Sequence, residues 1–121
     1  MANVQERSVG ERNGLAPLLE PFSVEVRPDR DRVIVVPHGE LDMATVGQVA
    51  ATIDELANRG FDAIVLDLRT TSFIDSSGVH LALQQTARRD ARVTLIDGTQ
   101  RVSRVFDVAG VRHLLPFETA Q

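Results

Sequence analysis

The chain has 121 residues, enough for one domain that buries roughly two thirds of its unfolded surface around an ordinary core. It contains no cysteine, which excludes a disulfide framework, thiolate metal sites and a cysteine nucleophile. The formal net charge of −4 and the absence of Trp and Tyr argue against a groove for a phosphate backbone and against a base-stacking platform, so we expect no direct contact with nucleic acid.

No apolar run approaches the roughly 18 to 20 residues that a membrane helix requires. The N-terminus is polar and mixes Glu6, Arg7, Glu11 and Arg12, which is typical of neither a transmembrane anchor nor a signal peptide. We therefore expect a cytoplasmic protein that does not insert into membranes.

Residues 1–20 mix charged residues with Gly and Pro and show no sustained periodicity. Such a segment cannot repay the entropy of ordering, so we expect a flexible N-terminal arm, followed by one domain over 21–121. The first strand of that domain is indicated by Phe22, Val24 and Val26, which alternate with polar residues as in a strand with one buried face.

A turn at 28–31 leads to a second predicted strand at 33–36, and the two strands form a predicted hairpin. Pro37 lacks a backbone donor and Gly39 is conformationally permissive. The second strand should therefore lose its regular pairing near His38.

The clearest periodicity predicts a helix from Met43 onward that ends near Gly60. One apolar stripe recurs there at helical spacing: Val46, Val49, Ala50, Ile53, Leu56 and Ala57. Two starts are open, because Asp42 can cap this helix, while Thr45 with Gln48 offers a capping box one turn later.

A short run of β-forming residues at 63–68 predicts the central strand. The junction at 72–79 joins it to a second helix, in which apolar and small residues again recur at helical spacing: Val79, Ala82, Leu83, Thr86 and Ala87. A strand thus feeds a helix through a short polar loop.

The last part of the chain predicts a strand at 92–96, a helix from Thr99 to Gly110 and a final edge strand at 114–117. The order is then β-β-α-β-α-β-α-β. It predicts an α/β domain with three helices, able to cover one sheet face, and a mixed, mostly parallel sheet whose opening hairpin adds an antiparallel edge.

The loop before the second helix carries the candidate site. Asp75, Ser76 and Ser77 all favour helix N-caps, where their oxygens accept hydrogen bonds from unpaired backbone N–H groups. With Asp75 as the cap, both serines lie at the positive end of the helix dipole, where phosphate oxygens are favoured. Ser77 is thus a candidate phosphoryl acceptor, although serines at such positions usually only cap the helix.

Three segments of the chain resemble the STAS domain family, in particular the bacterial anti-sigma factor antagonists. Gly39-Glu40-Leu41-Asp42 is similar to the Gly-x-Leu-Asp segment of that family. Phe73-Ile74-Asp75-Ser76-Ser77-Gly78 is similar to its phosphorylation loop, and Val105-Phe106-Asp107-Val108-Ala109-Gly110 to the segment leading to its last strand. The three occur in the family's order from Phe22 to the end of the chain, which implies a STAS-like fold.

The resemblance implies a regulatory binding module that is not an enzyme and holds no cofactor. Unphosphorylated, the module would bind an anti-sigma factor with serine kinase activity and so free a sigma factor for transcription. That kinase would phosphorylate Ser77, the residue immediately before Gly, with Ser76 as the alternative, and a phosphatase would reset the switch. A different interpretation is a STAS module in a lipid-transport or stress-signalling complex.

The residues expected to face the partner are Asp42, Asp75, Ser76, Ser77, Gly78 and His80. Most of them also have a purely structural explanation: the two aspartates as caps, and Gly78 as a position of close backbone approach. His80 is expected to be exposed, and it departs from the small or aliphatic residue of the family, which would tune the choice of partner.

Ser77, His80 and Asp75 superficially suggest the Ser-His-Asp site of a small serine hydrolase. The Gly-x-Ser-x-Gly pattern of a nucleophile elbow is missing, and residues three apart on one helix rarely align a base with a nucleophile, so this is the least favoured interpretation. His38 and His113 are isolated, which predicts no metal site. No Gly-x-Gly-x-x-Gly or Walker sequence predicts a nucleotide pocket.

Overall fold

The computed structural model describes residues 21–119, so the arm expected at 1–20 lies outside the described residues. Along the chain the elements are β1 (Ser23–Asp29), β2 (Arg32–Leu41), α1 (Val46–Asn58), β3 (Ala63–Asp67), β4 (Thr71–Ile74), α2 (Ser76–Thr86), β5 (Arg92–Ile96), α3 (Gln100–Ala109), the 3-10 turn η1 (Arg112–Leu114) and β6 (Phe117–Glu118). No helix within this range combines the length and the hydropathy needed to cross a membrane.

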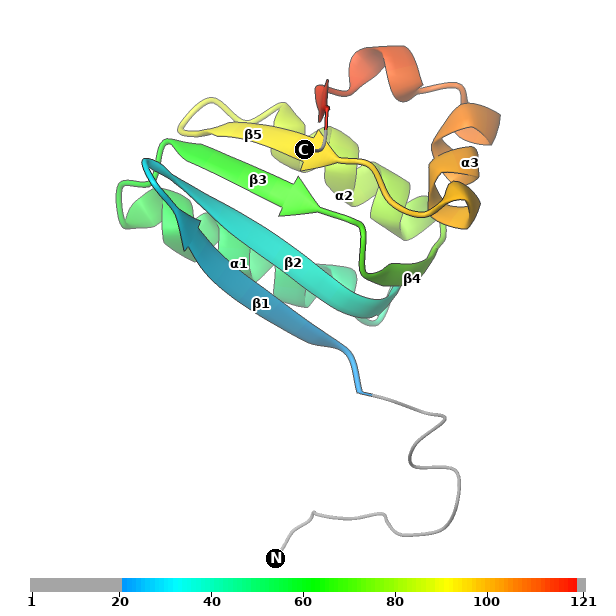
Figure 1. Cartoon of the computed structure of the whole chain (residues 1–121), viewed down its shortest axis with the longest axis horizontal. Helices are drawn as coiled ribbons and strands as arrows, with labels where there is room; N and C mark the ends of the chain where they lie inside the picture. The colour runs from blue at the N-terminus through cyan, green and yellow to red at the C-terminus, as the bar shows by residue number, and fades with distance from the viewer. Residues whose placement is uncertain (1–20, 120–121) are drawn as a thin grey trace, which may run out of the picture.

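The sheet has the predicted mixed arrangement (Figure 1). Its strands lie in the order β1-β2-β3-β5-β6, with β1 antiparallel to β2 and the other neighbours parallel. The predicted order of strands and helices is confirmed, and β4 is an additional short strand in the stretch expected to be a loop. β4 pairs with the last residues of β2.

The expected loss of regular pairing near His38 is confirmed, although β2 itself continues to Leu41. The pair of His38 with Ser23 is the last one between β2 and β1. β2 pairs with β3 over residues 33–35 and with β4 from Gly39 onward. The register with β4 shifts between Gly39 and Glu40, where Gly39 has a φ of +117°. The permissive backbone of Gly39 therefore bends the strand without ending it.

Both faces of the central strands are buried, although α1 and α2 cover only one of them (Figure 1). On the helix face, strand residues join the main core: Val33, Val35, Ile64, Leu66, Val93 and Leu95. On the opposite face lies a smaller apolar cluster: Ile34, Val36, Val65 and Ile96. Burial on both faces explains why β2 and β3 have continuous apolar sequences instead of alternating ones.

α3 lies at the β4 end of the sheet and not over the middle of the helix face (Figure 1). It buries Phe106, whose ring meets that of Phe117 edge-to-face at 5.3 Å. The final strand predicted at 114–117 is displaced, because η1 occupies Arg112–Leu114 and β6 begins only at Phe117. Arg112 holds that turn by donating to Asp97 Oδ2 at 2.9 Å and to the Ser103 carbonyl at 2.7 Å.

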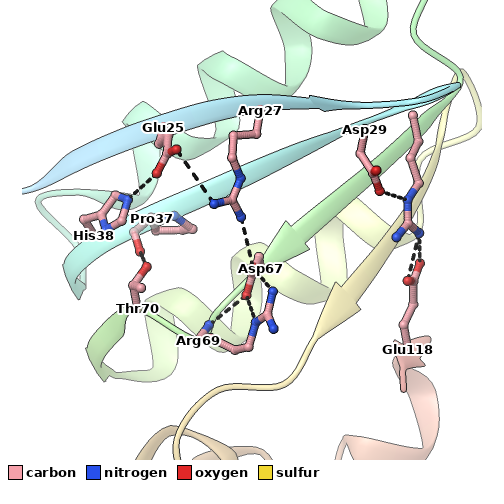
Figure 2. A network of polar contacts seen from close by, with 10 residues as sticks. Glu25, Arg27, Asp29, Pro37, His38, Asp67, Arg69, Thr70 and Glu118 are labelled. Carbon is pink, nitrogen blue, oxygen red and sulfur yellow. Dashed lines mark hydrogen bonds and ion pairs between the residues drawn. The ribbon is translucent and has the colours of Figure 1, made fainter. Parts of the chain in front are cut away.

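Charged side chains border the face of the sheet that carries no helix (Figure 2). Asp67, buried at the end of β3, accepts hydrogen bonds from Arg69 Nε at 3.0 Å and Nη2 at 2.8 Å, and Arg27 of β1 approaches it at 3.7 Å. Burial alone would raise the pKa of Asp67, but the hydrogen bonds from Arg69 outweigh it and hold that pKa below its usual range. The ion pair between Arg27 and Asp67 thus links β1 to β3.

Candidate partner-binding site

α2 begins at the predicted junction with Asp75 as its N-cap, so the predicted cap is confirmed. The Asp75 backbone is extended, with φ −115° and ψ −167°. Its Oδ1 accepts hydrogen bonds from the backbone N–H of Ser77 at 2.8 Å and of Gly78 at 3.4 Å. Asp75 thereby engages donors that a helix start would otherwise leave unpaired.

The two serines share the first turn of α2 but differ in exposure. Ser76 is exposed, whereas Ser77 is half-buried and lines an open groove between α1 and α2. Its side chain is therefore accessible from the groove and is not sealed in the core. A serine at a helix start can be modified only if an enzyme can reach it from solvent, and the open groove meets this condition for Ser77.

Gly78 brings the first turn of α2 unusually close to the sheet. A Cβ added to Gly78 would lie 2.3 Å from Ile74 Cγ1 and 3.2 Å from the Leu41 carbonyl oxygen. A side chain does not fit there, so the structural explanation of Gly78 as a point of close backbone approach is confirmed. The same close contact fixes the position of the first turn of α2 and therefore of Ser77.

Asp42 and Asp75 lie at the same edge of the sheet, where the carboxyl ends of β2 and β4 lie next to each other. Leu41 of β2 pairs with Ile74 of β4, and the Asp75 N–H donates to the Leu41 carbonyl at 3.4 Å. The next residue of each strand is an aspartate, so Asp42 and Asp75 follow directly after the ends of two neighbouring strands. Open α/β sheets place their binding surfaces at this edge.

α1 begins at Val46, and neither predicted cap forms as expected. Oδ1 of Asp42 accepts from the backbone N–H two residues on, within the turn before the helix. Thr45 holds the N-cap position without a side-chain cap bond, so its expected capping box with Gln48 is wrong. The Thr45 hydroxyl instead donates to the Glu40 carbonyl at 2.8 Å and fastens the start of α1 to the end of β2.

The sequence interpretation missed an apolar part of this edge. Met43, directly after Asp42, is 82% exposed, and Phe73, two residues before Asp75, is 41% exposed. Phe73 lies on β4, which the sequence analysis did not recognise as a strand. The alternation of buried and exposed residues along a strand could therefore not be used to predict that Phe73 faces solvent. Exposed apolar side chains beside charged ones are characteristic of surfaces that bind other proteins.

The geometry gives no support to a serine hydrolase. His80 is exposed, as expected, and lines the same groove as Ser77. Within residues 21–119, however, no hydrogen bond joins the Ser77 hydroxyl to His80 or His80 to Asp75, whose Oδ1 is engaged by main-chain N–H groups. A Ser-His-Asp relay needs both bonds. In the same range no three His, Asp or Glu side chains gather as a metal site would require.

Comparison with known proteins agrees with this geometry. A family model described as STAS domain matches residues 22–120. The chain belongs to the STAS domain family. The match includes every strand and helix described above. The STAS domain here is similar to a protein of Staphylococcus epidermidis named anti-sigma-B factor antagonist, with 26% identity over 80 residues that cover 64% of this chain and 74% of the relative.

Two solved structures of proteins named SpoIIAA are also similar. The anti-sigma factor antagonist SpoIIAA in its unphosphorylated form is 30% identical with a TM-score of 0.61, and the match covers 82% of this chain and 89% of SpoIIAA. The Bacillus cell fate determinant SpoIIAA in its phosphorylated form is 28% identical with a TM-score of 0.56, and the match covers 82% of this chain and 92% of SpoIIAA.

Proposed function

We propose that this STAS domain is a cytoplasmic anti-sigma factor antagonist whose docking surface is switched off by phosphorylation of Ser77. The observation that carries the proposal is Ser77 itself, an accessible serine in the first turn of a helix capped by Asp75. The similarity of the domain to SpoIIAA, which has been solved in an unphosphorylated and a phosphorylated form, supports the same conclusion.

The partner in this proposal is an anti-sigma factor with serine kinase activity. The partner supplies the ATP and the base: the Ser77 oxygen bonds to the γ-phosphorus, the bond from that phosphorus to ADP breaks, and the hydroxyl proton passes to the partner's base. This domain contributes binding and presentation of the serine and is not itself an enzyme. A phosphatase that hydrolyses the phosphoserine resets the surface.

Phosphorylation weakens docking through charge. A phosphoryl group adds about −1.5 to −2 charge. It arrives beside the Asp75 carboxylate, which accepts from the backbone N–H of Ser77 at 2.8 Å, and on an edge that also carries Asp42. A partner that covers this edge must then desolvate three neighbouring anions. Since a loss of about 1.4 kcal/mol changes affinity tenfold, one repulsion and one lost hydrogen bond suffice for release.

Phosphoryl transfer from labelled ATP tests the proposal. Each purified anti-sigma factor of the source organism that contains a serine kinase domain is incubated with the STAS domain, and the labelled peptide is identified by mass spectrometry. We expect label on wild type and on Ser76→Ala and none on Ser77→Ala. We also expect Ser77→Asp to bind the kinase more weakly than Ser77→Ala.

Other serines provide the contradicting outcomes. Ser103 is a poor acceptor because its hydroxyl donates to Asp97 Oδ2 at 2.8 Å and accepts from Arg112 at 2.6 Å. Label on Ser103, or on Ser8 outside the described residues, would move the site. Equal binding of Ser77→Asp and Ser77→Ala would remove the charge switch.

A further inference from the structure

The groove between α1 and α2 extends beyond Ser77 and is lined by residues of both helices. It has a volume of about 240 Å³ and extends from Ser77 along both helices. Its walls are mainly aliphatic or small, with three polar residues, and consist of Val46, Gly47, Ala50, Ser77, His80, Leu81 and Gln84. An open, largely apolar groove of this kind is suited to a side chain that leaves water on binding.

The size of the groove argues against a small-molecule ligand. Sites for cofactors and drug-sized ligands usually enclose about 300 to 1,000 Å³ and converge several polar groups on the ligand. This groove is smaller, and its apolar walls offer only Ser77, His80 and Gln84 for polar contact. An aliphatic or aromatic side chain of a protein partner fits it better.

Gly47 gives independent reason to regard the groove as functional. Glycine within a helix costs stability relative to alanine, and the usual structural reasons for it are a positive φ or a close approach of the backbone. Gly47 meets neither need: its φ is not in the left-handed region, and a Cβ added there would meet no atom within 4 Å. The absence of a side chain at Gly47 leaves the groove wide without serving the fold.

The position of Ser77 in the wall identifies the occupant. A kinase that phosphorylates Ser77 must place its active site over that serine, and it then covers the mouth of the groove that Ser77 lines. We propose that the groove between α1 and α2 receives an apolar side chain of the anti-sigma factor kinase, so that docking extends from the edge of the sheet onto α1. This proposal rests on the proposed function.

Filling the groove tests the proposal without weakening the fold. Gly47→Leu places an aliphatic side chain at the open position, and leucine is also a better helix former than glycine. Gln48→Leu is the matched control, because Gln48 is the exposed neighbour on α1 and does not line the groove. The measurement is isothermal titration with the purified kinase that labels the wild-type domain, beside urea unfolding of each variant.

We expect Gly47→Leu to be at least as stable as wild type and to bind that kinase at least about tenfold more weakly, the loss typical of a blocked central contact. Gln48→Leu should bind like wild type. Wild-type affinity in a folded Gly47→Leu variant, or an equal loss in both variants, would overturn the groove while leaving the proposed function intact. A change in oligomeric state with unchanged kinase binding would assign the groove to a second copy and also overturn it. Failure of the wild type to bind any such kinase would remove the proposed function itself, and the groove proposal with it.

Discussion

Replacing Gly78 with alanine tests the close approach of α2 to β4, which sets the position of Ser77. A Cβ at Gly78 would lie 2.3 Å from Ile74 Cγ1, 2.8 Å from Ile74 Cδ1 and 3.2 Å from the Leu41 carbonyl oxygen. Ile74 is buried, and the Leu41 carbonyl belongs to the main chain. The new methyl group therefore fits only if α2 or Ile74 moves.

Two contributions of opposite sign determine the magnitude. Overpacking a filled site costs about 1 to 3 kcal/mol, whereas alanine in a helix is favoured over glycine by about 0.5 to 1 kcal/mol. Because 2.3 Å is far inside contact distance, the cost belongs near the upper end of its range. We expect a net loss of about 2 kcal/mol in the free energy of unfolding, and for a domain of this size a fall in Tm of about 8 °C.

Urea unfolding followed by circular dichroism measures this loss, and Gly47→Ala is the matched control. The same substitution at Gly47 meets no atom within 4 Å, so it should stabilise the domain by about 0.4 to 1 kcal/mol. The two variants should therefore move in opposite directions. A Gly78→Ala variant as stable as wild type would mean that α2 does not lie against β4 as described.

Other substitutions separate stability from binding. Asp75→Ala should cost about 0.5 to 2 kcal/mol in urea unfolding by removing the cap of α2, while Asp75→Asn should cost little; equal stability of both would contradict the cap. Asp67→Asn should cost about 1 to 2 kcal/mol at neutral pH, less than a fully buried pair, because both neighbouring arginines are half exposed. The folded pKa of Asp67 is lowered, so its contribution to stability is present above the unfolded pKa and is lost as pH falls through the folded value. Wild type and Asp67→Asn should therefore begin to converge in stability as pH falls below about 4. A gap that stays constant in acid would refute the ion pair. Phe73→Ala and Phe61→Ala remove rings that are 41% and 40% exposed at opposite ends of the sheet, and titration with the kinase should show a loss of affinity only for Phe73→Ala.

Features that depend on local chemistry could be predicted from the sequence. The apolar stripe of α1 is set by burial of one helix face, and its buried members include Val49 and Ile53. The Asp75 cap is a contact between residues two and three apart, so it is also decided within the chain segment itself. The STAS resemblance added the role of Ser77, which the capping pattern alone did not distinguish from that of Ser76.

Features that depend on distant partners could not be predicted. β4 is a strand only because β2 extends past Gly39 and offers it a partner, and Phe73 faces outward for the same reason. The groove needs α1 and α2 together, so neither helix pattern contains it. The final strand was misplaced because Arg112 bonds to Asp97, fifteen residues earlier, and holds the chain in a turn.

The affinity of the kinase for the domain with and without phosphate on Ser77 is the most direct test of the charge switch. Homogeneous phosphoserine at position 77 and the unmodified domain are titrated in parallel against the same anti-sigma factor. We expect phosphorylation to weaken binding by at least about tenfold, with a smaller effect at high salt, since the repulsion from Asp75 is electrostatic. Equal or tighter binding of the phosphorylated domain would contradict the proposed switch.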